Sequence, residues 1–307
     1  MSETRFRTLR DVPTNDYVYP GSPLCAGCGP QLLVREFLKV LGDDTIVVTV
    51  PSCMGLLTLY PYAAIRQPGL FAPFGAGPAA VQGLVDALEI LKGERRPKVL
   101  LITGDGAAYD IGLQATSSTI HKGLDFYYLV YDNEAYGNTG FQFSSATPFA
   151  AKTSTTPPTT QSQGNTLRKK DLFAIWAAHR PAYLSTVAVS KTVDLWRKVE
   201  KSMELRGPKL FIGLGVCPTG WWSDPKETVK LDALAVDTGM WPLKEYVEGE
   251  VRHTYIPKAR KPVEEYLSRQ RRFEHLFKPV KRDDIIAEIQ RDVDRYWERV
   301  LSSESPR

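Results

Sequence analysis

The 307-residue sequence has only four cysteines, and no apolar run approaches the roughly 18–20 residues that a membrane-spanning helix needs. Its N-terminal stretch, MSETRFRTLRDVP, lacks the apolar segment of a secretory signal peptide. Lysine and arginine (39) nearly balance aspartate and glutamate (35), and a net charge of +4 is too small to indicate a nucleic-acid partner. We therefore expect a cytoplasmic protein rather than a membrane, secreted or nucleic-acid-binding one.

The composition is that of a globular protein, with 43% hydrophobic and 24% charged residues. Residues 1–24 are polar and interrupted by prolines, which predicts an extended N-terminal arm, and residues 25–222 are expected to form the main domain. Residues 223–307 are charged and broken by prolines, so we expect a C-terminal extension that packs on this domain or on a partner. Within it, residues 283–301 predict one amphipathic helix.

Apolar stretches alternate with segments of helical periodicity through the main domain. The stretches predict strands at 45–50, 98–103, 125–133, 183–189 and 209–216, with helices at 31–40, 80–93, 109–123, 171–180 and 192–205. Such alternation is typical of an α/β fold with a mostly parallel sheet and helices on both faces. Residues 137–170 predict a long irregular segment. We expect its part 144–160 to border a site or an interface, with a mobile solvent loop as the alternative.

Gly104-Asp105-Gly106 follows the predicted strand 98–103 directly, at the end of the strand where parallel sheets bind ligands. Glycines there let the backbone approach a phosphate, and a following helix N-terminus favours the anion. Asp105 alone could be a helix cap. However, Asn133 ends the next apolar strand 28 residues later, so two strands deliver a carboxylate and an amide oxygen to one edge. Such oxygens suit Mg²⁺ completed by phosphates and water.

The four cysteines are Cys25 and Cys28 in a CAGC sequence, Cys53 and Cys217. Cys53 and Cys217 each follow a predicted strand, so we expect them at the same sheet edge as the GDG sequence. By number, four thiolates fit a [4Fe–4S] cluster or a structural zinc equally well. One pair with two distant single cysteines differs from the two compact pairs usual for zinc, and the proline after Cys217 is similar to the end of ferredoxin-type ligand sets. Alternatively, the single cysteines are small buried residues and the CAGC pair is a redox pair.

The GDG sequence with Asn133 at this spacing resembles the thiamine-diphosphate motif. That resemblance implies that Asp105, the side chain of Asn133 and the carbonyl of Ala135 hold Mg²⁺ against the diphosphate. A wider resemblance, covering about residues 24–246, is to the β subunits of 2-oxoacid:ferredoxin oxidoreductases, pyruvate:ferredoxin oxidoreductase in particular. It is carried by CAGCG, GDGAAYDIGLQA, YDNEAYGNTGFQFSSATPFAAKTSTTP, CPTGW and AVDTGMWPLKEY.

The family resemblance implies a thiamine-diphosphate-binding fold, a ligand set and a reaction. The four cysteines would bind one [4Fe–4S] cluster near thiamine diphosphate, and Asn138 would lie beside the reactive carbon as the catalytic residue. The residues implied at the cofactor are Gly104, Asp105, Gly106, Asn133, Ala135, Tyr136, Asn138, Thr139, Cys53 and Met54. A 2-oxoacid and coenzyme A would then give acyl-CoA, CO₂ and two electrons for ferredoxin or another acceptor.

The chain contains no second half of a thiamine site. The resemblance places the glutamate that activates the aminopyrimidine ring on an α subunit, and further clusters on γ and δ (ferredoxin-like) subunits or their fusions. We therefore expect the isolated chain to be catalytically inert.

Three departures from the family bear on the substrate. Pyruvate enzymes commonly read YMNTGIQRS where this chain reads YGNTGFQFS, so Gly137 and Phe143 replace a bulky residue and an arginine. Residues 20–22, PGS, stand where the family has a histidine before the cysteine pair. Pyruvate is the expected substrate; the alternatives are phenylglyoxylate or another aromatic 2-oxoacid, and oxalate. Two further hypotheses are a non-redox thiamine decarboxylase and a non-catalytic, zinc-stapled scaffold.

Overall fold

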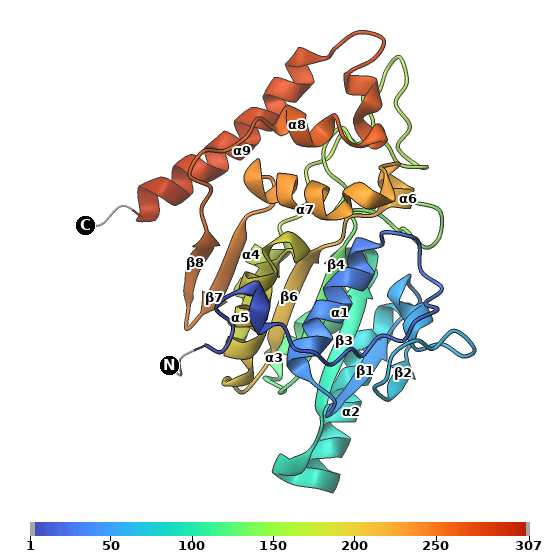
Figure 1. Cartoon of the computed structure of the whole chain (residues 1–307), viewed down its shortest axis with the longest axis vertical. Coiled ribbons are helices and arrows are strands. Elements are labelled where there is room, and N and C mark those ends of the chain that lie inside the picture. The colour runs from blue at the N-terminus through green and yellow to red at the C-terminus, as the bar shows by residue number, and fades with distance from the viewer. Residues whose placement is uncertain (1–3, 305–307) are drawn as a thin grey trace.

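The structure is a computed structural model that describes residues 4–304; the first three residues of the predicted arm and the last three of the predicted extension lie outside this range. The described chain is built around an eight-stranded sheet with the order β2-β1-β3-β4-β6-β5-β7-β8 (Figure 1). The strands are β1 (Thr45–Thr49), β2 (Gly69–Phe71), β3 (Lys98–Gly104), β4 (Tyr127–Asp132), β5 (Tyr183–Val187), β6 (Lys209–Leu214), β7 (Leu243–Val247) and β8 (Glu250–Tyr255). Strands β1 to β6 are parallel, whereas β7 runs antiparallel to both of its neighbours, β5 and β8.

Helices cover both faces of the sheet. On one face, α1 (Gly29–Leu41) and α5 (Thr192–Met203) pack on each other and on β4, β5 and β6. A second cluster of buried apolar side chains receives residues from the remaining long helices and two short ones. These helices are α2 (Gly77–Lys92), α3 (Leu113–His121), α4 (Leu172–Ala177), α7 (Thr228–Asp237), α8 (Val263–Leu267) and α9 (Asp283–Glu304). The short α6 (Pro218–Trp221) follows β6. No helix among the described residues has the length and apolarity that a membrane crossing requires.

The predicted α/β fold with a mostly parallel sheet is confirmed. The strands form where the predicted apolar runs lie, because each of these strands is buried along almost its whole length. The predicted helix 109–123 is broken, since a π-helical turn at Gly106–Ile111 precedes α3. Between β4 and α4 the described chain has neither a helix nor a strand of the sheet, as the composition of residues 137–170 predicts.

The sheet edges hold the strands that the sequence did not predict. All three residues of strand β2 are exposed, so its sequence need not contain the apolar run by which a buried strand is predicted. Strands β7 and β8 form a hairpin whose two-residue turn, Glu248-Gly249, has positive φ at both positions, as a type I′ turn requires. This hairpin extends the sheet through pairing of β7 with β5. Residues beyond 222 therefore contribute both strands and core side chains to the main domain.

The N-terminal segment runs along the domain surface. Phe6 is buried against Trp196 of α5, with ring centroids 5.5 Å apart. Further along, the backbone amide of Tyr19 donates to the carbonyl of Ala64 over 2.7 Å. These contacts lead the chain to the CAGC sequence, just ahead of α1.

Candidate active site

Four neighbouring parallel strands deliver the predicted site residues to one edge of the sheet. Strands β1, β3, β4 and β6 stand side by side, and their carboxyl ends lead to Cys53, Asp105, Asn133 and Cys217, respectively. These four residues are neighbours because their strands are adjacent in the sheet, although the residues are far apart in the sequence. Ligands of open parallel sheets bind at this edge.

Asp105, Asn133 and Ala135, the three predicted magnesium ligands, lie in mutual contact. One atom of the Asn133 side-chain amide is 2.7 Å from Oδ1 of Asp105 and 2.8 Å from the carbonyl oxygen of Ala135. Asp105 and Asn133 are both buried. A carboxylate, an amide oxygen and a backbone carbonyl that meet at one point form a donor set suited to Mg²⁺. The residues present therefore fit the predicted ion.

The Asp105 carboxyl lies in a setting that favours a bound cation. Burial and the charge of Asp132 raise its pKa well above the usual range. Ser144 Oγ donates a hydrogen bond to Asp105 Oδ2 over 2.5 Å and opposes this shift. Since an ionised carboxylate is costly to bury without a partner, a divalent cation at this point would supply the missing positive charge.

A cavity of about 160 Å³ opens beside Asp105. Its lining residues are Pro51, Ser52, Phe74, Gly104, Asp105, Gly106, Ala107, Tyr131, Asn133, Ala135, Tyr136, Gly137, Asn138 and Thr139. Most of the predicted cofactor residues are in this set, but Cys53 and Met54 are not, and Met54 is buried in the core beneath it. Asn138 and Thr139 are exposed at the rim. A Cβ atom on Gly106 would stand 2.4 Å from the Tyr136 ring, so any side chain at this position would have to displace that ring.

Cys25, Cys53 and Cys217 all lie close enough to Cys28 for electrostatic interaction, so the four form one neighbourhood, and none of them forms a disulfide. Gly29, next to Cys28, donates its backbone N–H to the carbonyl of Val216, next to Cys217, over 3.0 Å. Burial, with smaller contributions from the other cysteines, raises the pKa of Cys28 and of Cys53 to about 12.

Backbone N–H groups point at two of these sulfur atoms. The amide of Gly220 lies 3.3 Å from Cys217 Sγ, and the amide of Gln31 donates to Cys28. Such donors stabilise thiolates and tune the clusters that thiolates bind. In the described part of the chain, no three His, Cys, Asp or Glu side chains are grouped as ligands of a single metal ion.

Comparison with known proteins identifies the family. Residues 52–212 match the thiamine pyrophosphate enzyme, C-terminal TPP binding domain. The pyruvate synthase subunit PorB of Methanocaldococcus jannaschii is 41% identical over 293 residues, which cover 93% of this chain and 97% of that protein. The chain belongs to the β subunits of the 2-oxoacid:ferredoxin oxidoreductases.

A second relative supports this assignment, and a solved structure shares the fold. The ketoisovalerate oxidoreductase subunit VorB of Pyrococcus furiosus is 35% identical over 297 residues, covering 94% of this chain and 94% of that protein. A chain of the 2-oxoglutarate:ferredoxin oxidoreductase from Magnetococcus marinus shares the fold, with a TM-score of 0.57 and 18% identity over 71% of this β subunit and 79% of that chain.

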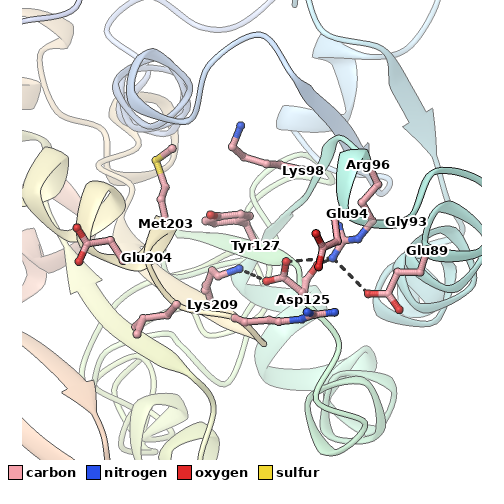
Figure 2. Close-up of a pocket in the computed structure, with 12 residues that line it drawn as sticks. Glu89, Gly93, Glu94, Arg96, Lys98, Asp125, Tyr127, Met203, Glu204 and Lys209 are labelled. Atoms are coloured by element: carbon pink, nitrogen blue, oxygen red, sulfur yellow. Dashed lines mark hydrogen bonds and ion pairs between the residues drawn. The ribbon is translucent and has the colours of Figure 1, made fainter.

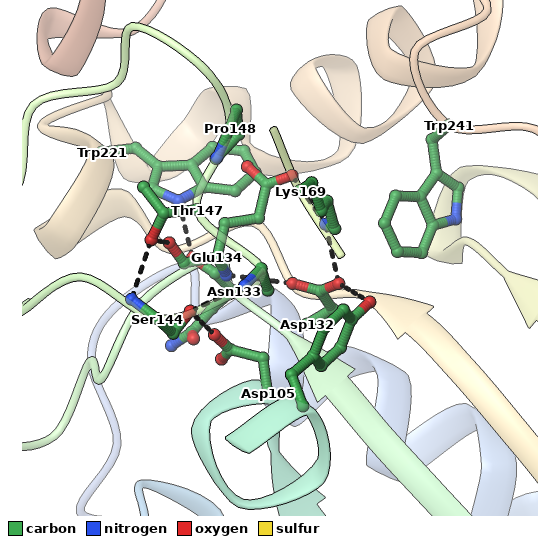
Figure 3. A network of polar contacts seen from close by, with 12 residues as sticks. Asp105, Asp132, Asn133, Glu134, Ser144, Thr147, Pro148, Lys169, Trp221 and Trp241 are labelled. Carbon is green, nitrogen blue, oxygen red and sulfur yellow. Dashed lines mark hydrogen bonds and ion pairs between the residues drawn. The ribbon is translucent and has the colours of Figure 1, made fainter. Parts of the chain in front are cut away.

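A buried charge network lies behind residues 133–135 of this β subunit, the segment that carries two of the three predicted magnesium ligands and is called the magnesium-ligand loop below (Figure 3). Lys169 Nζ is 2.7 Å from Asp132 Oδ2 and 3.1 Å from Glu134 Oε1. The other oxygen of Glu134 lies 2.5 Å from Arg272. Although burial opposes ionisation of Glu134, the two cations hold its pKa below the usual range. Tyr109 also donates to Asp132, over 2.6 Å.

Sequence reasoning missed Lys169 and Arg272, and it placed Ser144 only in a segment expected to border a site. No local pattern marks Lys169, which lies in the irregular segment, or Arg272, which is 138 residues from its partner Glu134. The signal that could have drawn attention to this region is the charged pair Asp132 and Glu134, which flanks Asn133 at the end of an apolar strand.

Two of the three departures that bear on the substrate, Gly137 and Phe143, do not open the space that the sequence suggests. A Cβ atom on Gly137 would be 2.5 Å from the second atom of the Asn133 side-chain amide, so the absent side chain leaves no free space on that side. Phe143 is half-buried and lines a separate hollow with Thr155 and Leu167, away from the cavity beside Asp105. Within this subunit, neither residue enlarges that cavity for an aromatic substrate.

A larger cavity, of about 540 Å³, lies at the opposite edge of the sheet (Figure 2). Its charged lining is balanced, with the bases Arg96, Lys98, Arg206 and Lys209 and the acids Glu89, Glu94, Asp125 and Glu204. Several of these charges pair with one another. Arg96, for example, lies 3.0 Å from Asp125, and Lys209 contacts the same carboxylate. The predicted site residues are all absent from its lining.

Proposed function

We propose that this β subunit holds thiamine diphosphate, Mg²⁺ and one [4Fe–4S] cluster in a coenzyme A-dependent pyruvate:ferredoxin oxidoreductase. The observation that carries the proposal is the convergence of Asp105, Asn133 and Ala135 beside a cavity at the sheet edge to which Cys53 and Cys217 also belong. Bound thiamine diphosphate supplies the electron sink for decarboxylation of a 2-oxoacid.

The chain's own residues would bind and orient the diphosphate end of the cofactor. The backbone at Gly106, at the start of a helical turn, can approach an anion closely. Asp105, Asn133 and Ala135 would bind Mg²⁺ between the protein and the phosphates. Asn138, exposed at the cavity rim, would donate a hydrogen bond from its amide to a substrate.

A cluster bound by Cys25, Cys28, Cys53 and Cys217 would receive the electrons. Support comes from the free state of the four thiols, their common neighbourhood and the N–H groups aimed at Cys28 and Cys217. Cys53 follows Pro51 and Ser52, which line the cavity, so this placement would set the cluster next to the cofactor.

The site would be completed by other subunits. The cavity of about 160 Å³ is small for a whole thiamine diphosphate, and Asn138 and Thr139 at its rim are exposed. An α subunit covering this rim would supply the glutamate for the aminopyrimidine ring. The γ and δ subunits, or their fusions, would carry the electrons on to ferredoxin, and the whole complex would work in the cytoplasm.

Pyruvate is the proposed substrate because several relatives that match more than nine-tenths of the chain are pyruvate synthase subunits. The test is an anaerobic screen of the purified complex with coenzyme A, a viologen acceptor and pyruvate, phenylglyoxylate, 2-oxoglutarate or oxalate. Pyruvate should reduce the viologen fastest. Faster reduction with phenylglyoxylate or oxalate would replace pyruvate by that acid.

The cluster is tested by Cys53→Ala in the same complex. We expect the variant to lose about four iron atoms per β subunit relative to the wild type and to stop reducing viologen. Bound zinc with no change in iron would favour the scaffold hypothesis. Unchanged release of CO₂ from the variant in the absence of an electron acceptor would favour a non-redox decarboxylase.

A further inference from the structure

We propose that Glu134 is a positioning residue for the magnesium-ligand loop, held in place by Lys169 and by Arg272 of the C-terminal extension. The inference rests on the proposed thiamine-diphosphate function and extends it to residues that do not touch the ion. Glu134 stands between two of the proposed ligands, Asn133 and Ala135, so its backbone conformation sets the direction in which each of them points.

The backbone of Glu134 adopts a conformation that a non-glycine residue rarely takes, with φ at +65°. Two hydrogen bonds hold it there: its N–H donates to Asp132 Oδ1 over 3.1 Å, and its carbonyl accepts from Thr147 Oγ1 over 2.8 Å. Figure 3 shows the Glu134 carboxylate directed toward Lys169 and away from Asp105. The left-handed turn thus separates the anchoring side chain from the ligands on either side.

The Glu134 carboxylate is bound at both oxygens. Lys169 is 3.1 Å from Oε1 and also binds Asp132, while Arg272 is 2.5 Å from Oε2. Two cations, Lys169 and Arg272, therefore face two carboxylates, those of Asp132 and Glu134. Because the charges balance, the four groups can be buried together, whereas a single unpaired charge would be costly to bury. Removing one partner leaves another charge buried and uncompensated.

Arg272 reaches the loop by a second route. Its guanidinium is fully buried and lies 3.9 Å from the centre of the Trp221 ring. The Trp221 indole donates to the backbone carbonyl of Asn133 over 3.0 Å. Arg272 thus supports the side chain of Glu134 directly and the backbone of Asn133 through the indole. Residues beyond 222 thereby gain a role in cofactor binding.

The test measures cofactor affinity rather than turnover. The assembled complex is freed of metal and cofactor with a chelator, and thiamine diphosphate is added in a calorimeter at increasing Mg²⁺ concentrations. Glu134→Gln should raise the Mg²⁺ concentration for half-maximal binding by about 10–100-fold, the usual effect of losing an outer-shell partner. Arg272→Lys should show a smaller rise, since lysine keeps the charge but loses the planar contact with Trp221.

Lys209→Met is the matched control. Lys209 is also a buried lysine bound to a carboxylate, Asp125, but it lies at the opposite edge of the sheet. We expect its Mg²⁺ dependence to equal that of the wild type. The double variant Glu134→Gln with Lys169→Met should bind more weakly than Glu134→Gln alone, because Lys169→Met also leaves the buried Asp132 carboxylate without its cation.

A Glu134→Gln complex with wild-type assembly, iron content and Mg²⁺ dependence would overturn the inference. If this variant fails to assemble, Arg272→Lys decides by the same criterion. A wild-type complex that binds no thiamine diphosphate would instead refute the proposed function, so the two failures are distinguishable.

Discussion

One atom of the Asn133 side-chain amide lies 2.7 Å from Oδ1 of Asp105, and the same atom lies 2.8 Å from the carbonyl oxygen of Ala135. Nitrogen suits this position when no cation is present, because its two hydrogens can be donated to both oxygens. Oxygen would suit it with the proposed Mg²⁺ bound, since Mg²⁺ prefers oxygen ligands. A half-turn of the amide would then give three oxygen ligands from Asp105, Asn133 and Ala135.

Asp105→Asn should weaken the Mg²⁺-dependent binding of thiamine diphosphate to the complex by about 100-fold or more, because it removes the only charged side chain among the three proposed ligands. Calorimetric titration of the metal-free complex measures this change. Asp110→Asn is the control, since Asp110 lies on the adjoining helical turn and contacts Lys170 and Tyr136 rather than the ligands. Equal losses in the two variants would contradict the assignment of Asp105 as a ligand.

Gly137→Ala should disturb the same ligand set from the other side. The added Cβ would meet the other atom of the Asn133 side-chain amide at 2.5 Å, so Asn133 has to move. We expect about a tenfold loss in Mg²⁺ affinity, in line with the loss of an outer-shell contact. Gly83→Ala is the matched control, because a Cβ there meets no atom within 4 Å and alanine favours helix α2. Normal Mg²⁺ affinity in Gly137→Ala would show that Asn133 is free to relocate.

The edge on which the site lies could be predicted from the sequence because it depends on local patterns. Asp105 and Asn133 directly follow apolar runs, and Cys53 and Cys217 come within a few residues of two others. In a parallel sheet all such ends meet at one edge. The adjacency of these strands follows from the sheet order, which no local pattern contains.

The charge network behind the loop could not be predicted, because it depends on the path of irregular chain. Lys169 is brought to Asp132 by a segment without helix or strand, and Arg272 arrives from a 3₁₀ turn late in the sequence. A lysine or arginine in such settings is usually an exposed, solvated charge. Only the folded structure shows that Arg272 is buried against Glu134 and Trp221.

Ser144→Ala should reduce Mg²⁺ affinity by a smaller factor, about three- to tenfold. Its hydroxyl donates to Asp105 Oδ2, so the substitution removes the hydrogen bond that helps to keep this carboxylate ionised and oriented. The same titration measures the effect, and Ser145→Ala at the next position is the control. An unchanged affinity in Ser144→Ala would show that bound Mg²⁺ alone orients Asp105.

Asp232 in α7 should make the stability of the subunit depend on pH. Its carboxylate is buried and accepts the backbone N–H of Ser190 over 2.8 Å. Burial raises its pKa to about 6 from an ordinary value of 3.8. The folded state therefore holds the proton more tightly than the unfolded state, so stability falls as pH rises from about 4 to about 6. Above that range, the ionised group costs up to about 3 kcal/mol of unfolding free energy.

Asp232→Asn keeps the acceptor for Ser190 and removes the ionisation. The melting temperature of the variant complex, measured anaerobically by calorimetry, should increase relative to that of the wild type as pH rises from 4.5 to 8. Any cost of burying the asparagine amide is equal at both pH values, so it cancels from this comparison. Asp86→Asn, on the exposed surface of α2, should give a difference from the wild type that does not change with pH. A flat difference for Asp232→Asn as well would show that Asp232 ionises as easily in the folded subunit as in the unfolded chain.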